Sequence, residues 1–393
     1  MINQHKKIAL LVSTDRYPDG DAGAVRQHAL AKIAIDLNYD VAIIGMGEST
    51  NFENRTHKGI TYTSFRSSRR SIVSRFMNLF FFTHRLIRYL KRNQKFDVIF
   101  FSDIPFRSIK YLEKYSRKKG SVIIHDSVEW YSPSQFMLSY LSPTYIRKNI
   151  LNQYMINRKT KIIAISDFLK NHFVKLGCKV CTIPAIIDID EYQETKTIDE
   201  HVVSIMYAGS AGKKDYLNEF LEAVASAKLI NSIKVDLYGV DERDLLRNGL
   251  KRQLFDQLGP IINIHGRVPR AEIVKALKKT DFSILFRDPK QRYSKAGFPT
   301  KFSESMGAST PMILNFTSDI SKYATDGDEI ILASGFSVEE IRISIERAIS
   351  MPKSEIVKMS ISARKCASMN FDYRNYKKSI ESLINDDEVN LCC

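Results

Sequence analysis

Short apolar runs alternate with longer amphipathic segments along almost the entire chain. Each run has the length of a strand, and polar or glycine-containing loops follow most of them. This alternation predicts β-α-β units, in which a parallel sheet is covered by helices on both faces. The predicted strands span residues 8–12, 40–45, 60–65, 97–102, 121–125, 161–165, 180–183, 203–208, 233–238, 261–265, 282–286, 312–316 and 329–332.

The chain of 393 residues is too long for one ordinary hydrophobic core and suits two domains. Charge divides it in the same way. Up to Ala185 there are 30 Lys/Arg against 13 Asp/Glu, whereas the remainder has 29 against 31. The charge break coincides with the Pro-Ala-Ile-Ile-Asp stretch at 184–188. We therefore predict an N-terminal domain at 1–184, a C-terminal domain at 185–366 and a C-terminal helix at 367–393 that returns to the first domain.

Composition narrows the class of protein further. No stretch reaches the roughly 18 to 20 apolar residues of a membrane span. Near the N-terminus, Lys6 and Lys7 precede a strand-sized run without a small-residue cleavage site, which does not match a signal peptide. The five cysteines lack the spacing of a disulfide framework or a zinc site, so we expect reduced thiols. These observations predict a cytoplasmic protein.

The stretch 294–304 has the features of a turn from a strand into a helix. It comes after the predicted strand 282–286, and Gly297 and Pro299 interrupt regular structure. Thr300 is expected to cap the helix that follows. The first turn of such a helix presents free backbone N–H groups and the positive end of its dipole. The turn therefore predicts an anion-binding site.

Two charged residues give this helix a more specific interpretation. Lys301 would add a full positive charge to the helix N-terminus. Glu304 follows one turn later, where a carboxylate can accept two hydrogen bonds from a ribose diol. A nucleotide-sugar site would need both parts.

The run Gly-Phe-Pro-Thr-Lys-Phe-x-Glu at 297–304, followed by Met-Gly-Ala-Ser-Thr-Pro and a strand, resembles the donor-binding segment of the GT-B glycosyltransferases of family 4. The resemblance implies an α/β fold with two Rossmann-like doubly wound parallel-sheet domains facing a central cleft. The first domain would bind the acceptor and the second the nucleotide-sugar.

The resemblance also implies residue roles for the donor site. The family Glu that matches Glu304 holds the ribose, but an earlier family Glu that contacts the sugar is replaced here by Ala296. The loop 209–214 resembles the family loop that holds diphosphate, with Ser210 at the position of its Arg, and we hypothesise that Arg287 supplies the missing guanidinium. The implied donor-binding residues are Gly23, Ser210, Lys213, Arg287, Gly297, Phe298, Pro299, Thr300 and Glu304, and the implied catalytic residues are His125, Lys214 and Lys301.

Acceptor contacts are assigned to the first half of the chain. The loop 17–24 lacks the spacing of a dinucleotide fingerprint, but it resembles the first glycine-containing loop of the family, in which Gly23 would let the backbone approach the donor. Polar residues follow the predicted strand 121–125, where open α/β sheets place their ligands. His125 resembles a family histidine that lines the cleft. The predicted acceptor-binding residues are Arg26, His28, Asp126 and Glu129.

The resemblance implies a retaining, metal-independent hexosyltransferase that uses a UDP-sugar or GDP-sugar as donor and no cofactor. Cations and N–H groups would meet the charge that develops on the leaving diphosphate. A metal-dependent fold with an Asp-x-Asp motif is the alternative within this reaction class, because the chain contains three such motifs, at 19–21, 188–190 and 326–328. Two of them contain Gly and are typical of turns.

The basic first half predicts an acidic partner. Between Asn54 and Phe96 there are eleven Lys/Arg and no acid. The helix predicted at 71–91 interleaves these charges with Phe76, Leu79, Phe80, Leu86, Ile87 and Leu90. We predict that residues 55–95 dock on an anionic membrane at the inner face of the cell, although the apolar face could instead be core. Docking would suit a glycan or lipid-linked acceptor in bacterial surface polysaccharide synthesis.

Two other functions are compatible with parts of the sequence. The chain could be a nucleotide-sugar epimerase or a non-catalytic GT-B protein. A nucleic-acid-binding protein is a remote alternative, because no helix-turn-helix, zinc-finger or RNA-recognition signature accompanies the charge. We expect no nucleic-acid partner.

Overall fold

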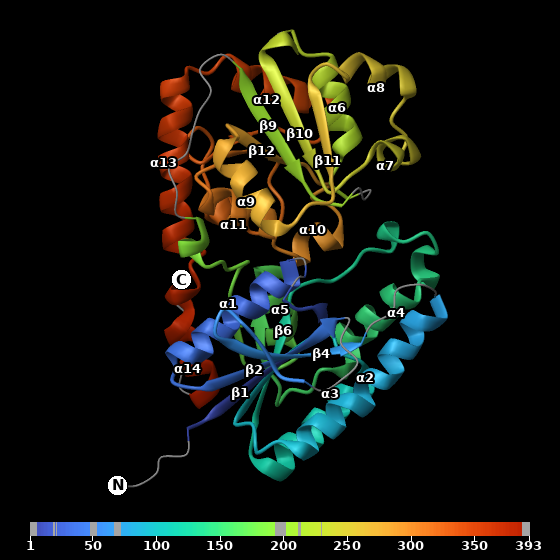
Figure 1. The fold of residues 1–393 in the computed structure, drawn as a ribbon, viewed down its shortest axis with the longest axis vertical. Helices are drawn as coiled ribbons and strands as arrows, with labels where there is room; N and C mark the ends of the chain where they lie inside the picture. Colours follow the sequence, from blue (N-terminus) through green and yellow to red (C-terminus); the bar gives the residue numbers. More distant parts are fainter. Residues whose placement is uncertain are drawn as a thin grey trace. The chain divides into compact units, whose positions relative to one another are not determined.

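The computed structural model describes residues 6–18, 20, 22–47, 53–66, 72–192, 202–210, 214–228 and 230–386. The chain forms two compact units (Figure 1). The N-terminal unit comprises residues 1–186 together with 373–393, and the C-terminal unit comprises residues 187–372. The chain thus passes between the units at 186–187 and at 372–373. The boundaries predicted from the sequence were 184 and 366.

The described part of the N-terminal unit contains an eight-stranded sheet in the order β3-β4-β2-β1-β5-β6-β7-β8. All neighbouring strands are parallel except β3 and β4, which are antiparallel. The strands are β1 Ile8–Arg16, β2 Asp40–Gly47, β3 Arg55–His57, β4 Ile60–Arg66, β5 Val98–Ser102, β6 Val122–Ser127, β7 Lys161–Ala164 and β8 Val180–Thr182.

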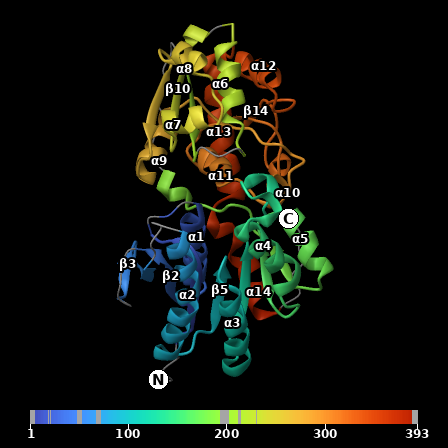
Figure 2. The same ribbon diagram turned by 90° about the vertical axis from the view of Figure 1, so that its right-hand side faces the viewer.

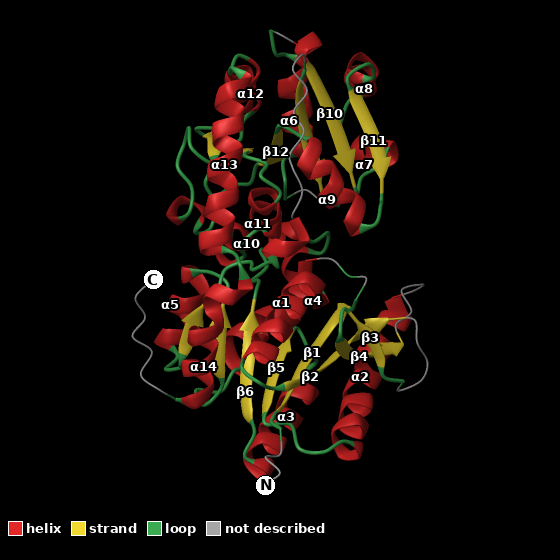
Figure 3. Cartoon of the chain, turned by 60° about the vertical axis from the view of Figure 1, so that its left-hand side comes forward, coloured by secondary structure: helices red, strands yellow, loops and turns green. Residues whose placement is uncertain are grey.

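Alternate residues of these strands build two cores, because successive side chains of a strand point to opposite faces. Leu11 and Ile43 pack on the face covered by α1 and α14, and Leu10 and Ile44 pack on the face covered by α2 and α3. Figure 3 shows helices on both sides of the sheet. The helices are α1 Ala22–Asp36, α2 Ile72–Arg92, α3 Phe106–Lys119, α4 Pro143–Ile150, α5 Asp167–Lys175 and α14 Lys377–Asn385.

The C-terminal unit has a six-stranded parallel sheet within its described residues, in the order β11-β10-β9-β12-β13-β14. Its strands are β9 Val203–Ala208, β10 Ile233–Tyr238, β11 Ile262–Gly266, β12 Phe282–Leu285, β13 Met312–Leu314 and β14 Ile330–Leu332. Its helices are α6 Leu217–Ala225, α7 Glu242–Arg247, α8 Arg252–Leu258, α9 Arg270–Lys279, α10 Arg292–Ala296, α11 Thr300–Gly307, α12 Val338–Ile349 and α13 Lys353–Asn370.

This second sheet is also covered on both faces. Phe282 and Ile284 of β12 join the core that α6 and α12 share, two helices that lie side by side (Figure 2). Ser283 points the other way, and its hydroxyl lies 2.5 Å from that of Ser305 in α11. Both units therefore have the doubly wound architecture predicted from the alternation of strands and helices.

Side chains cap the starts of two helices. Ser166 accepts the N–H of Leu169 at the start of α5. Ser337 and Glu340 form a capping box at the start of α12.

Two predicted segments differ from the structure. Thr300 does not cap α11 but is its first residue, because the Pro299 carbonyl already accepts the N–H of Phe302. The expected C-terminal helix is divided, since α13 ends at Asn370 in the C-terminal unit and α14 begins at Lys377 in the N-terminal unit.

Helix α2 has the length of a membrane span but not its composition. Within the described residues, no helix is both long enough and apolar enough to cross a bilayer. Leu86 and Leu90 of α2 are buried in the core, whereas Phe80 is exposed. Some apolar residues of this helix therefore pack in the core and others face outward. The side chains of Phe76 and Leu79, which were also predicted to face the membrane, lie outside the described residues.

Candidate functional site

In each unit the order of the strands reverses beside the unit's first strand. In the C-terminal unit, β9 lies between β10 and β12, and in the N-terminal unit β1 lies between β2 and β5. Open α/β sheets bind their ligands outside the carboxyl ends of the strands at such a switch point. The residues that follow β9 and β12 are therefore the first place to search for a site.

A buried aspartate, Asp215, binds cationic side chains at the switch point of the C-terminal unit. Its Oδ1 accepts a hydrogen bond from Nε of Arg287 at 2.8 Å, and its Oδ2 accepts one from Nζ of Lys301 at 2.5 Å. The hydroxyl of Tyr207 donates to the same Oδ2 at 3.1 Å. Arg287 comes two residues after β12, Tyr207 lies in β9 and Lys301 lies in the first turn of α11. Asp215 thus ties three elements together.

The charges of this cluster are strongly coupled. Burial by itself raises the pKa of Asp215, but Lys301, Arg287 and Lys214 outweigh this effect and hold the pKa well below its ordinary value. Burial lowers the pKa of Lys301 to about 8, although the Asp215 carboxylate acts in the opposite direction. One carboxylate is therefore surrounded by three cationic side chains, and the cluster keeps a positive balance at neutral pH.

Gly209, the residue after β9, allows this approach. A Cβ at this position would overlap Nζ of Lys301 and the hydroxyl of Tyr207. The Lys301 ammonium also lies 4.1 Å from the centroid of the Tyr207 ring, a distance at which cation–π attraction is effective. Because Gly209 has no side chain, the side chain of Lys301 can extend across the carboxyl end of β9.

The predicted phosphate turn adjoins the cluster through Lys301. Its backbone opens α11, whose first-turn N–H groups carry the positive end of the helix dipole. The side chain of Phe298 packs instead against the rings of Phe302, Tyr323 and Phe371. Phe298 and the buried Pro299 can therefore contribute only backbone to a ligand, whereas Gly297 and Thr300 are partly exposed.

Glu304 occupies a second polar position on α11. Its Oε1 accepts hydrogen bonds from Nε of Arg270 at 3.1 Å and from the hydroxyl of Tyr192 at 3.3 Å. Arg270 also pairs with Glu191 at 2.7 Å. A carboxylate has about four lone-pair positions, so these contacts to one oxygen leave Glu304 further capacity to accept hydrogen bonds.

The remaining predicted donor residues are placed as follows. Ser210 is exposed, and its carbonyl accepts a hydrogen bond from the Tyr207 hydroxyl at 3.2 Å. The carbonyl of Lys214 accepts one from the Tyr293 hydroxyl at 3.4 Å. Lys213 lies outside the described residues. Ala296, which replaces the sugar-contacting acid of the family, is fully buried.

Arg26 and Asp126, both predicted to bind acceptor, are buried and bind each other. Nε of Arg26 lies 2.8 Å from Oδ2 of Asp126, and its NH2 group lies 2.8 Å from Oδ1. The same guanidinium donates to the carbonyls of Ile183 and Pro184. The pair therefore joins α1 and β6 to the chain at 183–184 through hydrogen bonds within the protein, and its acceptor-binding role stays a prediction.

His125, predicted to contact the sugar, has no exposed surface. Its ring lies between those of Phe101, with centroids 5.0 Å apart, and Phe173, at 6.1 Å. Burial, followed by the nearby Lys148 charge, lowers the pKa of His125 to about 3. The structure therefore places this histidine among buried side chains and favours its neutral form, and the predicted sugar contact stays a prediction.

The other predicted residues of the N-terminal unit lie close to its switch point. His28 is buried, and its Nδ1 lies 2.8 Å from the hydroxyl of Tyr17. A Cβ at Gly23 would overlap the carboxylate of Asp15. The absence of a side chain at Gly23 therefore lets Asp15 pack against the start of α1. Glu129 is half-buried, and its carbonyl accepts a hydrogen bond from Asn152 at 3.3 Å.

The switch point of the N-terminal unit also contains charged residues that the sequence did not single out. Asp103, just after β5, is bound by Arg147 at 2.9 Å and lies 3.8 Å from Lys148. Burial raises the pKa of Asp103, but Lys148 and Arg147 outweigh it and hold the pKa below its ordinary value. Burial raises the pKa of Asp15.

Sequence reasoning also missed Asp215, Tyr207, Arg270 and Tyr192 in the C-terminal unit. One signal existed for Asp215, since it follows directly on the two lysines of the glycine-rich loop. No local pattern marks Arg270 or Tyr192, because both reach Glu304 from segments distant in sequence.

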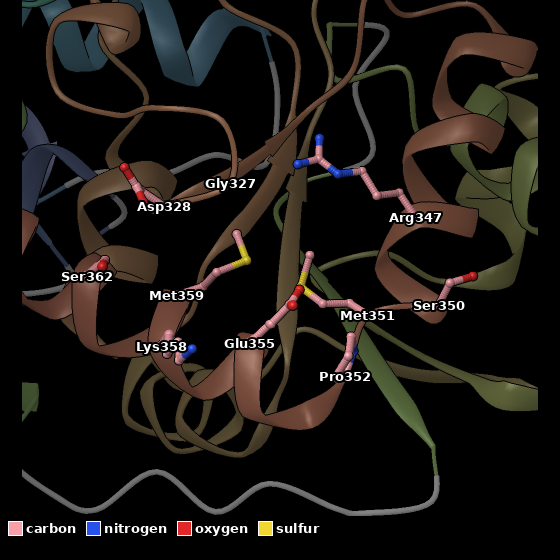
Figure 4. Close-up of a pocket in the computed structure, with 10 residues that line it drawn as sticks. All are labelled: Gly327, Asp328, Arg347, Ser350, Met351, Pro352, Glu355, Lys358, Met359 and Ser362. Atoms are coloured by element: carbon pink, nitrogen blue, oxygen red, sulfur yellow. The ribbon is translucent and has the colours of Figure 1, made fainter.

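A separate cavity of about 550 Å³ lies between the loop at Gly327 and helices α12 and α13 (Figure 4). Arg347 extends over it toward Gly327, and Glu355 and Lys358 of α13 line it. Arg347 is paired with Asp326 at 2.8 Å, so the third Asp-x-Asp motif serves a structural contact. None of the predicted site residues lines this cavity.

Comparison with known proteins agrees with the fold. Two doubly wound parallel-sheet units define the GT-B class of α/β proteins. Residues 24–191 match the family model described as Glycosyltransferase Family 4, and residues 188–365 match the model described as Glycosyl transferases group 1. The chain belongs to the GT-B glycosyltransferases of family 4 and is a glycosyltransferase.

Solved structures show the same fold at low sequence identity. Sucrose-phosphate synthase from Thermosynechococcus elongatus is 11% identical, with a TM-score of 0.76 over 97% of this chain and 99% of its own. HepE of Anabaena, solved with UDP and glucose, is 14% identical, with a TM-score of 0.66 over 96% and 100%. WaaG, a glycosyltransferase involved in lipopolysaccharide biosynthesis, is 16% identical, with a TM-score of 0.65 over 96% and 99%. A search of curated proteins found no match.

Proposed function

We propose that the C-terminal unit binds a nucleoside-diphosphate sugar, UDP- or GDP-linked, and that the enzyme transfers its hexose with retention of anomeric configuration. The observation that carries this proposal is the cluster of Lys214, Arg287 and Lys301 around Asp215. These cations lie beside the carboxyl ends of β9 and β12 and at the N-terminus of α11. A diphosphate carries the opposite charge and suits both the cations and the helix start.

The chemistry follows from where charge develops. As the bond between the sugar and the diphosphate breaks, its electron pair goes to the leaving phosphate oxygen. Cations and N–H groups that are already oriented lower the barrier by meeting this charge. Charge-assisted hydrogen bonds contribute about 1.5 to 3 kcal/mol each. In the proposed reaction the same phosphate then takes the proton of the acceptor hydroxyl, and no metal ion takes part.

Glu304 is proposed to hold the ribose of the donor. Arg270 and Tyr192 fix the carboxylate through Oε1, so its orientation is set before a ligand arrives. A ribose diol needs two hydrogen-bond acceptors, and a carboxylate supplies them. Because Ala296 is buried and carries no acid, sugar selection in this proposal depends on other groups near Gly297.

The proposed acceptor is a glycan or lipid-linked glycan used in bacterial surface polysaccharide synthesis at the inner face of the cell membrane. Helix α2 exposes the apolar side chains of Met77, Phe80 and Phe81. The same helix carries Arg85 and Arg88 further along its length. Exposed aromatic and basic side chains on one helix favour docking at an anionic bilayer. The docking proposal concerns this part of α2, because its other apolar residues are core.

A nucleotide panel tests the donor proposal. UDP, GDP and ADP should be compared by thermal shift, since a ligand present at about 100 times its Kd stabilises a protein by about 2.7 kcal/mol. We expect UDP or GDP to raise the melting temperature and ADP to have little effect. Incubation of the donor alone then separates a transferase, which hydrolyses it slowly, from an epimerase, which interconverts the intact donor. No stabilisation by any nucleotide would contradict the proposal, and loss of transfer in EDTA would contradict metal independence.

A further inference from the structure

The segment 137–141, between β6 and α4, exposes an unusual run of large apolar side chains. Met137 is 101% exposed, Leu138 59%, Tyr140 69% and Leu141 76%. Soluble surfaces carry isolated apolar residues, but four of this size among five consecutive positions form a patch that indicates an interaction. Ile146 of α4 is also exposed.

The segment has a regular backbone structure with its own hydrogen bonds. A 3-10 helix with a capping box between Ser132 and Gln135 leads into it, and a second 3-10 turn spans Ser139–Leu141. The N–H of Ser139 donates to the carbonyl of Phe136, and the N–H of Leu141 donates to that of Leu138. Backbone groups that are bonded within the segment can leave water without a large penalty.

Ser139 shows that the shape of the segment is held against local preference. Its φ of 45° lies in the left-handed region, which a residue other than glycine rarely adopts. Side-chain contacts maintain this conformation from both ends. The ring of Tyr140 contacts that of Tyr145 at 5.8 Å between centroids, and Tyr131 contacts Phe136 at 5.4 Å.

The charges of the surrounding chain favour one kind of partner. From Trp130 to Ser166 there are five Lys/Arg and no acid, but Arg147 and Lys148 bind Asp103 and Lys161 binds Asp386. The exposed cations of this stretch are therefore Arg158 and Lys159. Apolar side chains and a tyrosine, without carboxylates in the same stretch, suit the interface of a bilayer with anionic lipids. An acidic protein partner would instead be met by cations within the patch, and the 137–141 segment has none.

We propose that Met137, Leu138, Tyr140 and Leu141 insert into the surface of a lipid bilayer. Helix α4 begins directly after the segment and carries Arg147 and Lys148, which hold Asp103 at the switch point of the N-terminal unit. Insertion therefore brings the polar end of the sheet to the level of lipid head groups. The inference does not depend on the proposed transfer reaction, since membrane binding is measured without donor or acceptor.

The test uses the full chain with vesicles of phosphatidylcholine alone and vesicles that also contain phosphatidylglycerol, at low and high salt. The variant is Leu138→Ser with Leu141→Ser. A matched control is Ile343→Ser with Ile361→Ser, which removes apolar side chains of 55% and 66% exposure from the C-terminal unit. Salt screens docking through basic residues of α2, but it does not weaken apolar insertion.

We expect wild type and control to bind phosphatidylcholine vesicles at high salt and the 137–141 variant to bind about tenfold more weakly or worse. Three results would overturn the proposal: no binding of wild type to either vesicle, equal loss of binding in variant and control, or a change of oligomeric state in the variant without a change in vesicle binding.

Discussion

Nζ of Lys301 lies 2.5 Å from Oδ2 of Asp215, a residue 86 positions earlier in the chain. The contact joins the loop after β9 to the first turn of α11. It places a cation at a helix N-terminus and holds it there with a buried acid, which also binds Arg287. The stability of the C-terminal unit and the proposed donor site therefore depend on the same pair.

Replacement of Asp215 by Asn is expected to destabilise the protein. The substitution leaves Arg287 and Lys301 without their counter-charge, and loss of one partner of a buried ion pair costs about 3 to 5 kcal/mol. Urea denaturation measures the change. Glu242→Gln, which removes the partner of Arg252 in an exposed pair, should change the free energy of unfolding by about 0.5 kcal/mol or less. Equal effects of the two substitutions would show that Asp215 has no special role.

Affinity for UDP or GDP should fall as pH rises through the pKa of Lys301. The lysine is charged below its pKa of about 8 and loses its charge above it, so a diphosphate loses one charge-assisted hydrogen bond. Calorimetric titration between about pH 7 and about pH 9 should show a rise in Kd of up to about tenfold, because a group with a pKa of about 8 is about 90% charged at the lower pH and about 10% charged at the higher one. Lys301→Met should bind weakly at both pH values, and Lys295→Met, at an exposed neighbour, should behave like wild type. A pH-independent Kd for wild type would refute the role of Lys301.

Glu304→Ala should separate recognition of the nucleoside from recognition of phosphate. The carboxylate is proposed to bind ribose, whereas Lys214, Arg287 and Lys301 bind the diphosphate. We therefore expect the variant to bind UDP or GDP about tenfold more weakly, because a hydrogen bond to a charged group is lost, but to bind inorganic pyrophosphate as wild type does. If affinity for pyrophosphate falls in parallel, Glu304 acts through the fold of α11 and not through the ribose.

His125 should make the protein less stable in mild acid. Its pKa in the folded state is about 3 against an ordinary value of 6.5, so the unfolded chain binds more protons between these values. Stability from this group is complete above pH 6.5 and falls as pH decreases toward 3, at about 1.4 kcal/mol per pH unit. His125→Leu should remove this part of the slope in urea denaturation, and His84→Leu, at an exposed position, should retain it.

Much of the fold could be predicted because strands and helices leave local periodic signals. Strands such as β9 and β10 have the predicted bounds. Helices α7, α8 and α10 were missed because they are short and their apolar periodicity covers little more than one turn. Thr300 was misassigned as a cap because the sequence does not reveal that the Pro299 carbonyl opens the first turn.

The sequence by itself determined the alternation of strands and helices, the glycines that let chains approach closely, and the lysine and glutamate one turn apart on α11. These features depend on residues near one another along the chain. The pairing of Arg26 with Asp126, the enclosure of His125, and the convergence of Arg287 and Lys301 on Asp215 join residues 72 to 100 positions apart or depend on burial. Only the tertiary structure decided these, because burial and long-range charge pairing arise when sheets and helices pack together.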